Sequence, residues 1–240
     1  MPKVGQSLID FEHYKFCVGE VRLFRENRVA AARVNARLNH NDLTCAFVAV
    51  LIILSGTRAI RRYLSKLTHQ IDSDLSMIFP KDKDVSEVHL ERIVILPSCV
   101  AHMLIEYARH LTKLVSSLAD IGQLELASKF QALLDPTVSQ CELPIDYFSL
   151  INENFQEQEI SLCDIESALG YRWPIRLAET RGQYCRFMKT NGAAEFLNRQ
   201  QRGHQSIAYP FFGVHNQYSV YEYRREFRPY TDLFATELGF

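Results

Sequence analysis

The sequence lacks the cysteine and histidine spacings of a metal site or a disulfide framework. Its six cysteines are widely scattered, with no C-x-x-C pair and no histidine at metal-ligand spacing beside one. Scattered cysteines are typical of reduced, buried thiols in a cytosolic protein. They are Cys17, Cys45, Cys99, Cys141, Cys163 and Cys185. We therefore expect no metal site, and a structural role for each thiol.

The sequence also lacks an excess of charge of either sign. Lys and Arg number 27 against 28 Asp and Glu, which gives a formal net charge of -1. Nothing in this balance indicates a polyanionic partner, so a nucleic-acid surface would have to be a local concentration of cations. Internal repeats and low-complexity linkers are missing too.

Long hydrophobic runs are missing as well. The most apolar segment, residues 43–54, is only twelve residues long, too short to span a bilayer and suited to a buried helix. The first residues show no apolar core of a signal peptide. With 240 residues and 47% hydrophobic composition, the chain can bury a core of ordinary size. These features predict a cytoplasmic protein without a membrane partner.

Apolar periodicity predicts a mainly α protein with a small antiparallel β-sheet, an α+β fold. Two short runs, SMIF and RIVIL, flank a charged connection and predict a hairpin, and Pro97 then ends a strand before a long helix reaching Gly122. Further helices are expected at residues 41–54, 61–66, 124–134, 161–170, 179–192 and 193–203, and in a C-terminal helix interrupted near Pro229. Residues 1–40 are expected to form an N-terminal arm and residues 41–240 one domain.

One helix start is defined in detail by the sequence. Ser161 stands as N-cap with Asp164 at the third helical position, and Gly170 follows as the stop of that helix.

Three short motifs occur in a fixed order. Ser55-Gly56-Thr57-Arg58 leads through a helix to Ile71-Asp72, residues 178–192 carry an Arg, an aromatic residue and a terminal Asn-Gly, and Gly203-His204 follows after a further eleven residues. A charged hairpin turn containing Lys83, or Lys81 as the near alternative, lies between the first two. This order resembles the catalytic domain of the tyrosine recombinase (phage integrase) family.

The resemblance implies DNA cleavage and rejoining through a 3'-phosphotyrosine intermediate, which needs no cofactor. Arg58 and Arg181 would clamp the non-bridging phosphate oxygens. Lys83 would protonate the leaving 5' oxygen, His204 would bind a phosphate oxygen or steer the proton, and Tyr218 would be the nucleophile. DNA-backbone contacts are expected from Arg61, Arg62, Arg186 and Arg202.

The sequence departs from the family pattern in three ways. Ala178 stands at the position of the motif's His, and Gly213 stands where the family tyrosine is expected. The following segment instead offers Tyr209, Tyr218, Tyr221 and Tyr223 as candidates. Forty residues are also too few for the family's separate N-terminal helical domain.

Three functions remain open at this point. The first is a site-specific recombinase or integrase of a mobile genetic element, acting on double-stranded DNA as a homo-oligomer near the nucleoid. The second is an inactive relative that binds DNA or regulates. The third is a helical interaction protein without a DNA role, in which the arginines form a solvated helix face, Lys83 is an ordinary turn residue, and His204 caps or packs.

Overall fold

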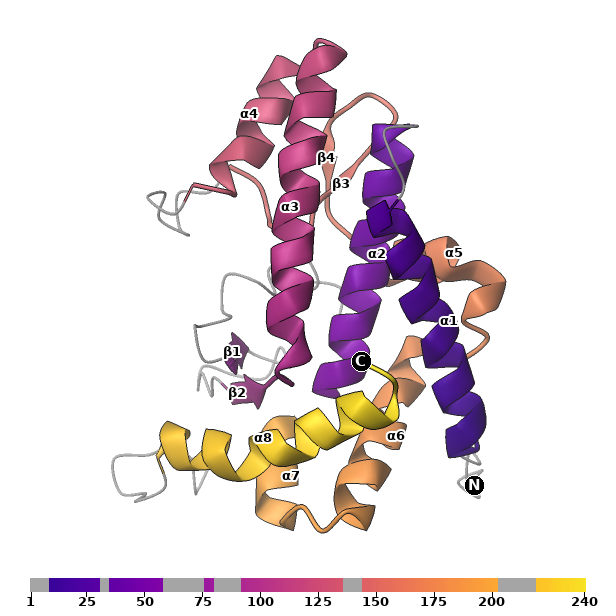
Figure 1. Ribbon diagram of the computed structural model, residues 1–240, viewed down its shortest axis with the longest axis vertical. Helices are drawn as coiled ribbons and strands as arrows, with labels where there is room; N and C mark the ends of the chain where they lie inside the picture. The colour runs from indigo at the N-terminus through magenta and orange to yellow at the C-terminus, as the bar shows by residue number, and fades with distance from the viewer. Residues whose placement is uncertain (1–8, 31–34, 58–75, 80–91, 136–143, 203–218) are drawn as a thin grey trace, which may run out of the picture.

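The protein is described by a computed structural model covering residues 9–30, 35–57, 76–79, 92–135, 144–202 and 219–240 (Figure 1). Helices dominate, and the two small sheets are antiparallel pairs, in agreement with the predicted α+β class. The elements are α1 (Phe11–Ala30), α2 (Ala36–Ser55), β1 (Ser76–Phe79), β2 (Arg92–Ile95), α3 (Cys99–Asp120), α4 (Leu124–Ala132), β3 (Leu150–Ile151), β4 (Glu157–Gln158), α5 (Leu162–Leu169), the 3₁₀ turn η3 (Gly170–Arg172), α6 (Leu177–Thr190), α7 (Glu195–Arg202) and α8 (Val220–Glu237).

Helix α2 forms the centre of the fold and is contacted by α1, α3, α5, α6 and α8 (Figure 1). It is longer than the predicted segment 41–54, because Asn35 caps it by accepting a hydrogen bond from the Leu38 amide. By length and composition it could cross a membrane, but 78% of its most apolar window is buried inside the protein. This burial favours the predicted core helix.

Helix α1 packs along α2, although residues 1–40 were expected to form an arm. Tyr14, Val18 and Val21 lie on one face of α1, and all three are fully buried in the same core as α2. Arg25, also buried, forms an ion pair of 2.8 Å with Glu106 of α3. The described part of the arm is thus a core helix, because its apolar residues recur at helical spacing and find a partner in α2.

The predicted hairpin is confirmed. Strands β1 and β2 pair antiparallel, with Met77 opposite Val94 and Ile78 opposite Ile93. Pro97 separates β2 from α3, which ends before Gly122 as expected. The expected connection of residues 80–91 and the helix at 61–66 lie outside the described residues.

The segments from α4 to α7 also follow the sequence prediction. Ser161 and Asp164 form a reciprocal capping box at the start of α5, and Gly170 ends that helix with φ of 53°. Gly192, with φ of 81°, separates α6 from α7. The sequence left residues 144–153, which contain β3, open between a crossing strand and a loop. The pairing of β3 with β4 was not predicted, because two residues per strand are too few to show an alternating pattern.

The predicted interruption of the last helix is wrong: α8 is continuous from Val220 to Glu237 with Pro229 inside it. Proline within a helix costs about 3 kcal/mol. Tyr223 and Phe227 before Pro229, and Phe234 after it, are all fully buried. Each buried aromatic ring contributes roughly 1.5–3 kcal/mol, so burial on both sides of Pro229 outweighs its cost.

The cysteine prediction holds in part. The described cysteines are free thiols, and Cys17 and Cys45 are buried, but Cys163 is exposed on α5 and therefore departs from the expected burial. An exposed position on a short amphipathic helix cannot be distinguished from a buried one by residue type alone.

Candidate functional site

Gln201, the penultimate residue of α7, joins four elements through its fully buried side chain. Its Nε2 donates to the carbonyl oxygens of Ser55 and Ile95 at 3.1 and 3.0 Å. Its Oε1 accepts from the Ile95 amide at 3.0 Å and from the Tyr223 hydroxyl at 2.8 Å. The side-chain amide of Gln201 thereby links α7 by hydrogen bonds to the end of α2, to strand β2 and to the first turn of α8.

The four joined segments adjoin the residues expected to carry chemistry. Ser55 lies three residues before Arg58, and Gln201 three residues before His204. Tyr223 lies five residues after Tyr218, and Ile95 belongs to the strand that follows the connection containing Lys83. Arg58, Arg61, Arg62, Lys81, Lys83, His204, Tyr209 and Tyr218 themselves lie outside the described residues.

A close backbone approach brings α6 to the start of the first motif. Gly56, in the left-handed conformation with φ of 63°, lies directly against the Tyr184 ring, and a Cβ at Gly56 would collide with Tyr184 Cδ1. Only glycine permits this contact at this backbone conformation. Beside it, the buried Ser55 and Thr57 hydroxyls form a 2.8 Å hydrogen bond.

Arg181 stands three residues before Tyr184 on α6, so the two share a helix face. Its side chain is partly buried. The structure therefore brings the helix of the second motif against the backbone of the first. Ala178 is the second residue of α6, Arg186 is exposed on the same helix, and Arg202 ends α7.

The tyrosine candidates differ in access. Tyr223 is fully buried, and its hydroxyl donates to Gln201, so it is unsuited to attack a DNA phosphate. Tyr221 is 70% exposed in the first turn of α8. Burial raises the pKa of the Tyr184 hydroxyl well above its usual range, and nearby Tyr223 adds to the rise. Both side chains are fully buried.

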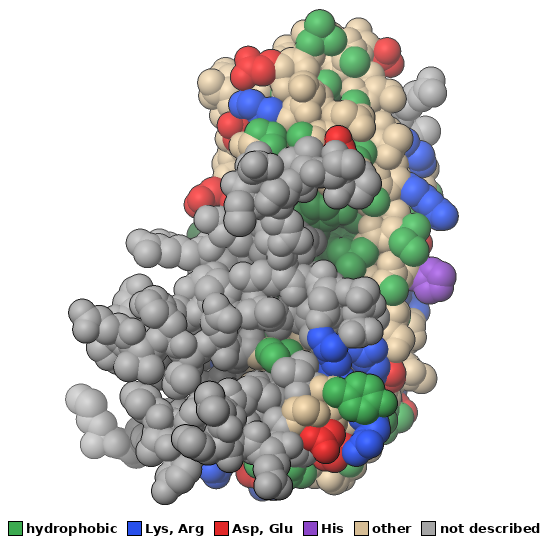
Figure 2. All heavy atoms as spheres, turned by 90° about the vertical axis from the view of Figure 1, so that its left-hand side faces the viewer, with side chains coloured by type: hydrophobic (Ala, Val, Ile, Leu, Met, Phe, Trp, Pro, Cys, Tyr) green, Lys and Arg blue, Asp and Glu red, His purple; other side chains and the backbone are tan. Residues whose placement is uncertain are grey.

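Charges on the side of the molecule that carries the β1–β2 hairpin are mixed. Among its described residues, Lys and Arg side chains lie next to Asp and Glu near the lower end of this face (Figure 2). The described part of this surface consequently does not carry charge of a single sign, in keeping with the near-neutral net charge of the sequence.

A second buried polar group lies away from Gln201, between α2 and α3. The fully buried His40 places Nε2 2.9 Å from the Ser149 carbonyl oxygen and Nδ1 3.0 Å from His110 Nε2. A carbonyl oxygen only accepts, so His40 donates from Nε2 and its Nδ1 accepts from His110. The two rings stack with centroids 5.3 Å apart. Within the described ranges, no group of three or more His, Cys, Asp or Glu is arranged to hold a metal ion.

Sequence reasoning missed Gln201 and both histidines, and it included Tyr184 only as the aromatic residue of the second motif. The glycine of the first motif was the one available signal, because a glycine after a buried helix often marks a close approach. A glutamine inside the polar segment EFLNRQQR gives no sign that it is buried.

No protein-family model, no curated protein and no solved structure matches this chain.

Proposed function

We propose that this chain is a DNA strand-transfer protein of the tyrosine recombinase type. Arg58 and Arg181 bind the non-bridging oxygens of one phosphodiester, and Tyr218 attacks its phosphorus. The bond to the 5' oxygen breaks as Lys83 supplies a proton, and His204 binds a phosphate oxygen or steers the proton. The 3'-phosphotyrosine keeps the energy of the broken bond, so rejoining needs no nucleotide.

The observation that supports the proposal is the junction at Gln201. Four segments, far apart in the sequence, meet at one buried amide. Three of them do so within three to five residues of Arg58, His204 and Tyr218, and the fourth does so at Ile95, twelve residues after Lys83. The contact between Gly56 and Tyr184 adds α6, and with it Arg181, to the same junction. A clamp built from distant arginines requires a framework of this kind, because small displacements of catalytic groups cost large factors in rate.

The experiment is a trapping assay with nicked duplexes of randomised sequence. A nick beside the cleavage position lets the short strand diffuse away after attack, so the covalent adduct accumulates and its DNA can be sequenced. We expect a labelled adduct with the natural chain and none with Tyr218→Phe. Tyr221→Phe is the matched control, because Tyr221 is exposed nearby on α8 and its loss should leave the adduct intact.

Arg181→Lys tests the clamp separately. Lysine keeps the charge but loses the planar fork, and removal of one positioned donor typically lowers a rate by about 10²-fold or more. Arg176→Lys, at an exposed arginine that directly precedes the same helix and pairs with Glu179, should leave adduct formation nearly unchanged. Equal adduct yields from the two variants would contradict a clamping role for Arg181.

The second candidate is a relative that binds DNA without cutting it. Ala178 favours it, because the residue at this position supplies a donor or general base in the family pattern. It predicts no adduct, together with DNA binding that weakens steeply with salt. Absence of binding even at low salt would remove both DNA functions and leave a helical interaction protein. In either DNA function, backbone contacts are assigned to Arg61, Arg62, Arg186 and Arg202.

A further inference from the structure

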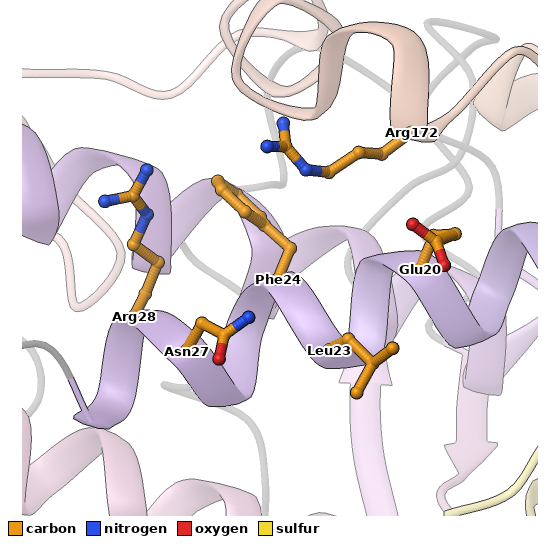
Figure 3. Close-up of a pocket in the computed structure, with 6 residues that line it drawn as sticks. All are labelled: Glu20, Leu23, Phe24, Asn27, Arg28 and Arg172. Atoms are coloured by element: carbon orange, nitrogen blue, oxygen red, sulfur yellow. The ribbon is translucent and has the colours of Figure 1, made fainter.

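Two arginines and two aromatic rings alternate at the junction of α1 and η3. Arg28 Cζ lies 5.0 Å from the centroid of the Phe24 ring, and Arg172 Cζ lies 4.7 Å from the same ring. Arg172 Cζ is also 4.7 Å from the Tyr171 ring. The guanidinium of Arg172 thus lies within cation–π distance of both rings, of which Phe24 is buried and Tyr171 is 84% exposed. In Figure 3 the two guanidinium groups flank Phe24, and that of Arg172 points towards Arg28.

Phe24, Arg28 and Arg172 line a pocket of about 330 Å³ together with Glu20, Leu23 and Asn27 (Figure 3). That volume is at the small end of ligand-binding pockets and exceeds that of a bare phosphate group, so a small ester fits. The wall is fixed, because Phe24 is only 6% exposed and belongs to the core.

The ring contacts leave the edge of the Arg172 guanidinium available. Aromatic rings cover the faces of a guanidinium, whereas all of its N–H donors lie in its plane and point outward. Among the described residues, Arg172 forms no ion pair or hydrogen bond. Arg28, by contrast, is paired with Asp42 at 2.9 Å. Arg172 is therefore the donor with capacity for an outside anion.

The local charge is balanced by two carboxylates at different distances. Asp42 is engaged by Arg28, and burial raises its pKa although Arg28 and Arg172 both oppose the rise. Glu20 lies eight residues before Arg28 on α1, roughly 12 Å along the helix axis, at the other end of the pocket. The four charges therefore sum to zero, and anion binding would depend on the in-plane donors of Arg172, which Asp42 does not engage, with Glu20 weakening it.

We propose that this pocket binds the phosphate group of a phosphate ester through the in-plane donors of Arg172, with Arg28 adding positive potential. Guanidinium and phosphate match in a bidentate geometry, and a guanidinium already in contact with the buried Phe24 ring loses less freedom on binding than a fully solvated one. Free small phosphate esters and the DNA backbone share this chemistry. The site lies on α1 and η3, apart from the Gln201 junction, and does not depend on the proposed strand transfer.

The test uses the fluorescence of Trp173, the one tryptophan of the chain, which is buried next to Arg172 in the sequence. Ribose 5-phosphate is titrated against ribose, and a short DNA duplex forms a second arm. We expect a saturable change with ribose 5-phosphate and none with ribose. Arg172→Gln should weaken binding about tenfold or more, as expected for loss of a charge-assisted hydrogen bond.

Two variants serve as controls. Arg176→Gln removes an exposed cation four residues away that pairs with Glu179, and it should bind like the natural chain. Glu20→Gln removes a nearby negative charge and should strengthen binding roughly two- to fivefold. This gain cannot come from a folding defect. Circular dichroism of Arg172→Gln is the control for folding and should show that its helices are retained.

The outcomes separate the possible sources of the phosphate. Loss of ribose 5-phosphate binding in Arg172→Gln supports the proposal with a small ester as ligand. Loss confined to the duplex arm supports it with the DNA backbone as ligand. Equal binding by the natural chain and Arg172→Gln in both arms, or no effect of Glu20→Gln in an arm that binds, would overturn it, whatever the trapping assay shows.

Discussion

Acidification to pH 5 is expected to destabilise the fold through His40 and His110. Burial lowers the pKa of His40 to about 3, with the neighbouring His110 contributing, and burial together with Lys113 lowers the pKa of His110 to about 4. Both rings therefore stay neutral in the native protein at pH 5. Protonation of His40 at Nδ1 would also place two donors against each other, because His110 already donates to that atom.

The size of the effect follows from the proton balance. In the unfolded chain both histidines titrate near 6.5, so below that pH the unfolded state binds more protons than the native state. Stability from the pair is present above pH 6.5 and is lost as pH falls towards the native pKa values. At pH 5 the difference is about 1.5 pH units, or about 2 kcal/mol for His40 and less for the partly exposed His110.

The total loss of roughly 3–4 kcal/mol is a large fraction of the 5–15 kcal/mol by which domains are usually stable. The assay is urea unfolding at pH 7.5 and pH 5.0, followed by circular dichroism. The double variant His40→Gln, His110→Gln should be less stable at pH 7.5 but lose about 3–4 kcal/mol less than the natural chain on acidification.

The double difference isolates the pair, because the natural chain and the variant share every carboxylate. His102→Gln, at an exposed position of α3, is the control and should lose as much as the natural chain. If the natural chain and the double variant lost equal free energy between the two pH values, the reasoning from burial would be refuted.

Two further predictions concern the junction of the candidate site. Gly56→Ala should lower the free energy of unfolding by about 2 kcal/mol or more, since it adds a left-handed alanine and a clash with the buried Tyr184 ring. Gly192→Ala is the control, because Gly192 has φ of 81° but no atom lies within 4 Å of an added Cβ. It should lower the free energy of unfolding by only about 1–2 kcal/mol in the same urea titration. Gln201→Leu should lower the free energy of unfolding by about 3 kcal/mol or more, because it leaves buried backbone groups of β2 without partners. Gln131→Leu, at an exposed position of α4, is the control and should change the urea midpoint little. Similar losses of stability in these two variants would contradict the role of Gln201.

Local structure was accessible from the sequence where residues close in the chain decide it. The capping box of Ser161 and Asp164, the end of that helix at Gly170, and the pairing of SMIF with RIVI all depend on neighbours within a few residues or on a short alternating pattern. The same local reasoning wrongly predicted that Pro229 interrupts the last helix. Its local cost is real, but the buried rings that outweigh it pack against distant elements.

The candidate site was accessible only in part. The order of the motifs suggested that Arg181 lies near the first motif, and the contact of Tyr184 with Gly56 agrees with that arrangement of α6. The means of assembly could not be deduced, since Gln201 contacts partners 106 and 146 residues away. Nothing in the composition of α7 distinguishes a buried amide from a solvated one.

The sequence by itself determined the helical class, the β1–β2 hairpin, the capping of α5 and the core character of α2, because hydrophobic periodicity and capping chemistry act over one or two turns. The tertiary structure alone decided that α1 packs into the core, that α8 runs through Pro229, that two histidines share one buried site and that Arg172 lies against the Phe24 ring. Each of these rests on contacts between residues far apart in the chain, whose free energy depends on burial and geometry that no local pattern records.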